Sequence, residues 1–282
     1  MKTPQKVDTI NIAWRVLDAK YFGLPQQRKR LYLLAGGLDF YPEDVLFELH
    51  TNSFTDYPTF PLVREEDGHS FEVFRSYSDC LYSAYGTKWN GNAAAYNGSL
   101  FAVQDGRLRR LSPIECERLM GFPEGYTDIS ASTRTTRYQA LGNSWAVPVV
   151  KWIGERLISE TLPRLNITVE AYKLYAEHTK DGCYVFDFGR EELVKFSDKT
   201  INCTSIPEEP RYKCLVDILS ADAPKEIFIS PVGCHGILRR KQERNMSINV
   251  RLEEVLTSIS SQMSQEEIER RSRVQKRGKY SN

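Results

Sequence analysis

The chain opens on a pattern that predicts two strands joined by a basic turn. Residues Ile10 to Leu17 alternate loosely between apolar and polar positions, which is typical of a strand. Gly23 and Pro25 then indicate a turn, and the basic run QQRKR follows. The next run, LYLLAGG, is short, apolar and closed by paired glycines, so it predicts a buried strand.

No helical period follows between Asp39 and Gln104. Aromatic residues, Asn, Gly and Ser dominate this stretch, and prolines stand at positions 42, 58 and 61. The pattern predicts a loop-rich or small β region.

Helix signals return in the run LRRLSPIECERLMGFPEGY. Ser112 and Glu115 have the spacing of a capping box, Pro113 takes the first helical position, and Gly121 follows the last turn. These signals predict a short helix from Pro113 to Met120.

A second helix is predicted in WAVPVVKWIGERLI, because its apolar residues share one helical face: Ala146, Val149, Val150, Ile153 and Leu157. Pro148 is compatible with a helix only near the first turn, so we expect the helix to begin around Ser144. Pro163 marks its far boundary.

Beyond this helix the pattern is mixed. Short β-like runs, CYVFDF and KCLVDIL, lie between Leu165 and Asp222. A helix is predicted to start at Ser230–Pro231, and a second amphipathic helix to run through Val250 to Ile259. Polar and charged residues dominate from Ser260 onward, and we expect the last ~20 residues to be disordered.

Composition adds the broad class. A length of 282 residues fits one or two domains, and 41% hydrophobic with 27% charged residues is ordinary globular usage. No apolar run approaches the ~20 residues of a membrane span. The start, MKTPQKVDTI, has no apolar core typical of a secretory signal, and the six cysteines show no CxxC or Cys/His ligand spacing. We therefore expect an intracellular protein without a membrane partner, a disulfide framework or a metal site.

Charge is balanced overall but uneven along the chain. Eight acidic residues stand against two basic ones between Tyr41 and Arg75, whereas eleven basic residues stand against six acidic ones between His235 and Asn282. Basic runs such as RRKQER can contact phosphate backbones, and solvated helix faces give the same pattern. Both interpretations stay open.

Three motifs carry a family resemblance. FGLPQQRKRLYLLAG at 22–36, RRLSPIECERLMGFP at 109–123 and YQALGNSWAVPVV at 138–150 resemble, in order and spacing, the last three motifs of the DNA (cytosine-5) methyltransferases. The resemblance implies an enzyme that flips a cytosine out of double-stranded DNA and transfers a methyl group to it from S-adenosylmethionine.

The resemblance assigns roles to two arginines and to a turn. It implies that Arg30 lies nearer the flipped base and Arg28 nearer the DNA backbone, although without the other motifs QQRKR reads as a solvated basic turn. It implies that Asn143 and Ser144, in a G-N-S turn that opens a helix, line the cofactor pocket; plain helix capping explains the same residues. Trp145 departs from the smaller residue common in the family.

Further residues are candidates for contact with DNA. We expect Gln26 in the first motif and Arg109 before the second to contribute. The interval between these motifs corresponds to the family's target-recognition region, where aromatic and amide side chains suit stacking and base-edge hydrogen bonds: Tyr82, Tyr85, Lys88, Trp89, Asn90 and Asn92. A surface hairpin with ordinary aromatics is the alternative. Cys116 lies inside the predicted helix and is not expected to be a nucleophile.

Several motifs of the family are missing. None of the thirteen prolines is followed by cysteine, so the Pro-Cys nucleophile is absent, as are the F-x-G-x-G and E-N-V stretches. In the family these precede Q-x-R-x-R, so the chain resembles a C-terminal portion. It reads as one subunit of a split methyltransferase needing a partner chain, as an inactive fragment, or as a non-catalytic DNA-binding module. The run FISPVGCHGILRRKQERN resembles the tails of phage and prophage enzymes.

The expected fold is α/β. It comprises the end of a methyltransferase sheet domain (1–38), an inserted small, loop-rich β target-recognition region (39–106), closing helices (107–163), a mixed α+β C-terminal extension (164–260) and a disordered basic tail (261–282). Such a chain belongs in the cytoplasm of a bacterial or phage-infected cell. A strand and helix separated from their sheet would expose apolar surface unless a partner covered it.

Overall fold

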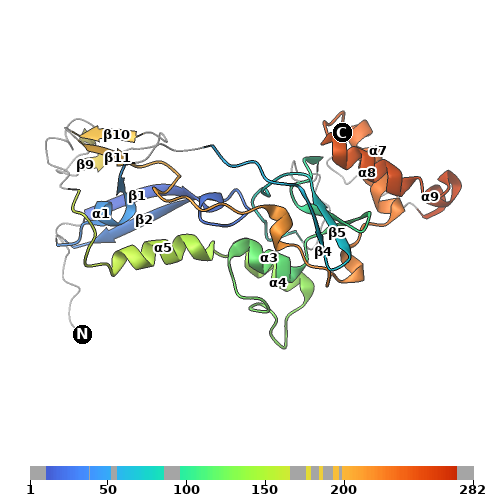
Figure 1. Ribbon diagram of the computed structural model, residues 1–282, viewed down its shortest axis with the longest axis horizontal. Coiled ribbons are helices and arrows are strands. Elements are labelled where there is room, and N and C mark those ends of the chain that lie inside the picture. The colour runs from blue at the N-terminus through green and yellow to red at the C-terminus, as the bar shows by residue number, and fades with distance from the viewer. Residues whose placement is uncertain are drawn as a thin grey trace, which may run out of the picture. The chain divides into compact units, whose positions relative to one another are not determined.

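The computed structural model describes residues 11–37, 39–51, 56–85, 96–165, 176–178, 184–186, 193–196 and 199–271. The chain forms two compact units (Figure 1). The first unit comprises Met1–Thr59, Met120–Phe122 and Ser144–Lys213, and the second comprises Phe60–Leu119, Pro123–Asn143 and Cys214–Asn282.

The first unit is built on an antiparallel strand pair. β1 (Asn11–Asp18) pairs along its whole length with β2 (Lys29–Gly36), and a short 3₁₀ helix, η1 (Ala19–Tyr21), lies in the turn between them. The predicted strand, basic turn and strand are confirmed. The expectation that LYLLAGG is buried is wrong, because Leu31 and Leu33 are 60% and 54% exposed. Among the described residues, helices cover one face of the pair.

Two helices cover that face. α5 (Val147–Leu157) and α1 (Pro42–Leu46) share a core with the inward residues of β1. Pro148 lies in the first turn of α5, as its ring requires, and Val149 and Ile153 are buried. Leu157, expected on the same face, is 45% exposed. α1 was not predicted, because five residues are too few to show a helical period.

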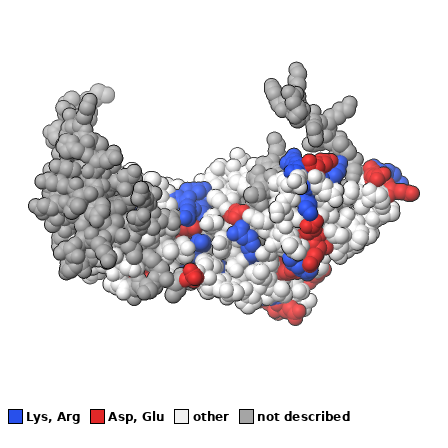
Figure 2. All heavy atoms as spheres, turned by 90° about the horizontal axis from the view of Figure 1, so that it is seen from above, with Lys and Arg blue, Asp and Glu red and all other residues white. Residues whose placement is uncertain are grey.

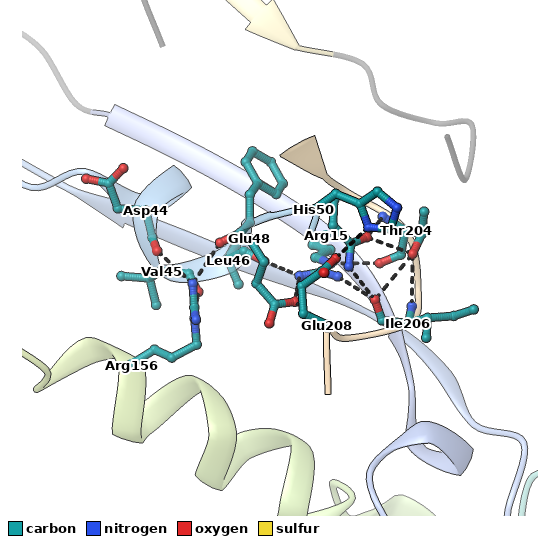
Figure 3. Close-up of polar contacts among 12 residues, drawn as sticks. Arg15, Asp44, Val45, Leu46, Glu48, His50, Arg156, Thr204, Ile206 and Glu208 are labelled. Carbon is teal, nitrogen blue, oxygen red and sulfur yellow. Dashed lines mark hydrogen bonds and ion pairs between the residues drawn. The ribbon is translucent and has the colours of Figure 1, made fainter. Parts of the chain in front are cut away.

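Two guanidinium groups, one buried and one partly buried, hold the carbonyl end of α1 (Figure 3). Arg15, from β1, donates to Leu46 O at 2.7 Å and pairs with Glu48 at 3.0 Å. Arg156, from α5, donates to Val45 O at 2.6 Å and also to the carbonyls of Asp44 and Phe47. Burial lowers the pKa of Arg15, and Glu48 opposes that shift. The helix end therefore satisfies its free carbonyls with side chains from β1 and α5.

Smaller strands complete the first unit. β10 (Leu193–Phe196), β11 (Lys199–Asn202) and β3 (Glu48–Leu49) form a three-stranded antiparallel sheet, and β8 (Ala176–His178) pairs with β9 (Tyr184–Phe186). The expected β-like run CYVFDF thus contains a strand. The run KCLVDIL does not, because Leu215–Ile218 form a 3₁₀ helix, η2, in the second unit.

The second unit contains a four-stranded antiparallel sheet in chain order: β4 (Val63–Glu66), β5 (His69–Val73), β6 (Phe101–Gln104) and β7 (Arg107–Arg110). An Asp-Gly pair with positive φ closes each of its two tight hairpins, at Asp67–Gly68 and Asp105–Gly106. The prediction of a small β region between Asp39 and Gln104 is confirmed for β4, β5 and β6, and β7 lies beyond it. Its role as a target-recognition insert stays a prediction.

The second unit also contains helices that follow the sheet in the sequence. α3 (Pro113–Met120) begins and ends as predicted, and its capping box is formed, with Ser112 N donating to Glu115 at 2.7 Å and Glu115 N to Ser112 Oγ at 3.2 Å. α4 (Arg134–Asn143) was not predicted. A 3₁₀ helix, η3, spans Lys225–Ile227.

The C-terminal part of the second unit is helical. α7 (Pro231–Glu243) begins at the predicted Ser230 cap, α8 (Val250–Ser260) covers the predicted second helix, and both share a core with β6 and β7. α9 (Gln265–Arg271) forms where a disordered tail was expected, with Ile268 buried. Residues 272–282 of the predicted tail lie outside the described residues. Among the helices that the structure describes, none is long and apolar enough to cross a membrane.

Candidate functional site

The basic turn of the first unit is organised by a buried carboxylate. Asp18 lies at the end of β1, fully buried, and its Oδ1 accepts the backbone N–H of Arg28 at 2.9 Å and that of Lys20 at 3.4 Å. Burial raises the pKa of Asp18, and these two backbone donors oppose the rise. The carboxylate therefore joins both ends of the turn that carries the Q-x-R-x-R motif.

The two arginines of the motif have different surroundings. Arg28 is buried, and its Nη2 donates to the carbonyl of Ser144 at 2.7 Å. Arg30 is exposed, and its Nη1 donates to Lys29 O at 2.8 Å. Burial raises the pKa of Tyr32, and the positive charges of Arg28 and Arg30 oppose that rise. The turn thus brings the first motif against the middle of the third, at Ser144.

Gln26 lies in the interior beside the same turn. Its side chain is fully buried, with Nε2 3.1 Å from the Sδ of Met120. Gly121, at φ +80°, follows Met120, and a Cβ there would lie 2.5 Å from the Cδ of Pro148. This close approach packs the Met120–Phe122 segment of the first unit against the first turn of α5 in the same unit. Gln26 is therefore placed to support the turn and is not on the surface.

The G-N-S turn does not open a helix. Gly142 and Asn143 are the last residues of α4, and α5 begins three residues after Ser144, at Val147. The expectation that its backbone N–H groups lie at a helix start is wrong, because α4 continues through the glycine. Asn143 is exposed and Ser144 is partly buried.

Trp145 presents a large aromatic surface beside the turn. Its side chain is 66% exposed, and its ring meets the edge of Tyr32 with centroids 6.5 Å apart. An exposed indole and a half-buried phenol therefore lie together, and exposed Arg30 stands two residues before Tyr32 on β2. Such a group can stack on an aromatic ring and hydrogen-bond a carbonyl.

Two of the expected DNA contacts lie in the core of the second unit. Arg109 is fully buried and forms a two-pronged ion pair with Glu115, both distances being 2.8 Å. Tyr85 is 4% exposed, and its hydroxyl donates to Leu100 O at 2.8 Å. Neither side chain is available to DNA in this arrangement. Lys88, Trp89, Asn90 and Asn92 lie outside the described residues.

Cys116 is a core residue. Its thiol is fully buried in α3, and burial, with the neighbouring Glu115 and Glu117, raises its pKa well above the usual value. A thiolate, the nucleophilic form, is therefore disfavoured. The five cysteines that the structure describes are free thiols, and within the described ranges no group of three or more His, Cys, Asp or Glu side chains could hold a metal.

Sequence reasoning missed Glu117. Its buried carboxylate accepts the backbone N–H of Gly125 at 2.6 Å and of Thr127 at 2.9 Å, and it pairs with Arg137 at 2.9 Å. These bonds fix the loop between α3 and α4. A charged residue on the inward face of a predicted helix was the only available signal.

Comparison with known families agrees with the motifs. Residues 68–159 match the family model of the C-5 cytosine-specific DNA methylases. The match includes the second and third motifs and confirms the predicted resemblance; the first motif, at 22–36, lies outside it.

Curated relatives match about half of this chain. The type II methyltransferase M.MspI of Moraxella sp is 29% identical over 186 residues, which cover 55% of this chain and 41% of the relative. The DNA N-6-adenine-methyltransferase of Escherichia phage P1 is 24% identical, covering 52% and 36%. The type II methyltransferase M2.BsuMI of Bacillus subtilis (strain 168) is 30% identical, covering 51% and 39%. The chain spans about two fifths of the length of these relatives.

Among solved structures, the methyltransferase EhMeth of Entamoeba histolytica is similar at a TM-score of 0.32 and 18% identity, over 52% of this chain and 53% of that one. That likeness is too low to bear on the fold.

Proposed function

We propose that this chain, which carries part of a C-5 cytosine-specific DNA methylase domain, supplies the base-holding arginines and the closing helices of a DNA (cytosine-5) methyltransferase. The observation that carries the proposal is the bond from Arg28 to the carbonyl of Ser144. It joins the first motif to the third within one unit, while Arg30 stays exposed beside them. A merely solvated basic turn would not place Arg28 in the interior.

The two arginines divide the work. Arg30 is the candidate for holding the carbonyl of a flipped cytosine by a charge-assisted hydrogen bond. Arg28 was expected nearer the DNA backbone; buried against Ser144, it positions the turn on which the cofactor residues lie. Asp18 holds the Arg28 backbone in place.

S-adenosylmethionine supplies the methyl group in this proposal. The residues of the G-N-S turn fit this cofactor in part. The exposed amide of Asn143 and the hydroxyl of Ser144 are donors suited to its carboxylate end. The N–H groups of a helix start do not contribute, because α5 begins later. Double-stranded DNA is the partner, and the 39–106 region is the proposed reader of the target sequence.

A second polypeptide completes the enzyme in this proposal. The chain has no Pro-Cys pair, and it spans about two fifths of the length of its relatives. A cysteine nucleophile is needed to activate the cytosine ring. The described cysteines do not fit this task, because the four buried thiols are core residues and Cys80 lacks the motif. We place this activity in the cytoplasm of a bacterial or phage-infected cell.

The test is transfer of labelled methyl from S-adenosylmethionine to DNA, by this chain alone and with the product of the reading frame immediately upstream. We expect 5-methylcytosine only in the mixture. The phage P1 relative carries adenine in its name, so the methylated base is identified by digestion and chromatography. Detection of N6-methyladenine would mean that the methylated base is adenine and not cytosine. No transfer in either reaction would favour an inactive fragment or a DNA-binding module.

A further inference from the structure

The outer face of the β1–β2 pair is apolar at three of its four residue pairs, and the fourth, Asp18 with Lys29, lies next to the turn. Residues directly opposite in an antiparallel pair share a face, and three such pairs point away from α5: Ile12 with Ala35, Trp14 with Leu33, and Val16 with Leu31. We call these six residues the outer face. Leu31, Leu33 and Ile12 are 60%, 54% and 45% exposed.

This face is unlike a solvated sheet surface. An antiparallel sheet with one wet face alternates apolar residues inward and polar residues outward. β5 of the second unit does so, with Phe71 and Val73 buried, while on its other face Ser70 is exposed and Glu72 forms an ion pair with Arg251. The outer face has no polar side chain at any of its six positions. Its composition is typical of a sheet in which both faces are covered by other elements.

We propose that the outer face is the docking surface for a second polypeptide, the Pro-Cys-bearing part of a methyltransferase catalytic domain. This inference rests on the proposed function. The same two strands lead into and out of the turn that carries Arg28 and Arg30, so a partner seated on the outer face is held next to these arginines. About three fifths of the length of the relatives has no counterpart in this chain. The partner would supply the part that corresponds to it.

A second copy of this chain is the weaker occupant. It would add another pair of arginines and another apolar face, but no Pro-Cys pair, because the sequence contains none. Self-association through the outer face is therefore an outcome that the experiment must separate.

The experiment compares the double variant Leu31→Glu/Leu33→Glu with Ile158→Glu. Ile158 is 83% exposed in the same unit and lies off the outer face, so it is a matched apolar-to-acid control. The probe is the product of the reading frame immediately upstream, and the readout is its affinity for the full chain. We expect the double variant to bind it ~100-fold more weakly, as loss of a central apolar contact does, and the control to bind like the unchanged chain.

The outcomes are decisive. Equal affinity of the double variant and the unchanged chain overturns the docking surface, as does an upstream product that lacks Pro-Cys or fails to bind. Dimerisation of the unchanged chain that the double variant abolishes, without partner binding, reassigns the face to a second copy. Circular dichroism verifies that both variants are folded. A complex that forms through this face yet transfers no methyl group keeps the docking surface and refutes only the proposed function.

Discussion

The two arginines of the basic turn differ in burial, so replacing each of them should affect the stability of the fold differently. Arg28 is buried and bonded to Ser144, whereas Arg30 is exposed. Arg28→Ala should lower the free energy of unfolding by about 1.5–3 kcal/mol, the usual worth of a hydrogen bond to a charged group. Arg30→Ala should change it by less than ~0.5 kcal/mol. Both should reduce methyl transfer in the two-polypeptide assay by roughly 10- to 100-fold.

Lys29→Ala is the matched control, because it removes an exposed cation from the same run. Urea denaturation and initial rates of labelled methyl transfer give the two readouts. An Arg30→Ala variant as active as the unchanged chain would exclude a role in holding the base.

The Arg109–Glu115 pair makes a second prediction at the residue scale. Both side chains are fully buried, and Glu115 also closes the capping box of α3. Glu115→Ala leaves Arg109 charged without its partner, which costs about 3–5 kcal/mol. The double variant Arg109→Met/Glu115→Gln should be less destabilised than the sum of its single variants. Chemical denaturation measures each step, and additive losses would contradict a coupled pair.

At the scale of elements, local signals predicted well and distant ones did not. The ends of α3 were predictable because Ser112, Glu115 and Gly121 lie within one short run. α1 was missed because its carbonyls are held by Arg15 and Arg156, which lie 31 and 111 positions away from the carbonyls they reach. No period in five residues reveals such support.

The same limit applies to the candidate site. The motifs picked out Arg28 and Ser144 separately, but their contact spans 116 positions, and only the structure joins them. The exposed side of β2 escaped prediction for a related reason. An apolar run indicates that both faces are suited to burial, and it does not say whether this chain supplies both covers.

The loop between α3 and α4 should respond to acid through Glu117. Burial alone would raise the pKa of this carboxyl, but hydrogen bonds from Thr127, Arg137 and Gly125 outweigh burial and lower it. A lowered pKa in the folded state adds stability above the unfolded value, and this is lost as pH falls through the folded value. The gap in unfolding free energy between the unchanged chain and Glu117→Gln should therefore narrow from about pH 6 to about pH 3.

Glu124→Gln is the control for that titration, since the Glu124 side chain is 60% exposed in its pair with Arg118. Glu124→Gln should change the free energy of unfolding only slightly at every pH. A Glu117→Gln gap that stays constant or widens on acidification would show that the loop does not depend on the ionised carboxylate.

Alanine variants of two glycines after α3 distinguish the cost of a left-handed backbone from the cost of steric crowding. Gly121 and Gly125 have φ of +80° and +76°, but a Cβ at Gly121 meets Pro148 at 2.5 Å, while nothing lies within 4 Å of one at Gly125. Gly125→Ala should cost about 1–2 kcal/mol from the left-handed conformation alone. Gly121→Ala should cost a further ~1–3 kcal/mol from overpacking. If thermal unfolding shows that both variants lose the same stability, the close contact of Gly121 with Pro148 does not contribute to the loss.

At the scale of the whole molecule, the basic C-terminal region carries much of its charge in pairs. Lys241 lies 2.6 Å from Glu253, Arg251 bonds Glu72 and Glu254, and Arg271 lies 2.6 Å from Glu267. Basic and acidic atoms accordingly lie side by side on the part of the second unit that carries α7–α9 (Figure 2). Paired cations attract a phosphate backbone less than unpaired ones, because the nearby carboxylates reduce the local potential.

This pairing changes where DNA affinity is expected. Truncation after Ile237 would remove α8 with its buried Leu252 and Leu256, and so would test the core and not the charge. Deleting residues 272–282 removes Arg273, Lys276, Arg277 and Lys279 and leaves the described helices complete. If the tail contacts phosphates, the slope of log K against log salt should fall by up to ~0.9 per lost contact. Lys241→Gln, which removes a paired cation, should leave that slope unchanged. Fluorescence anisotropy on a duplex oligonucleotide at several salt concentrations measures both, and a slope that responds to Lys241→Gln but not to the deletion would move the contact from the tail to α7.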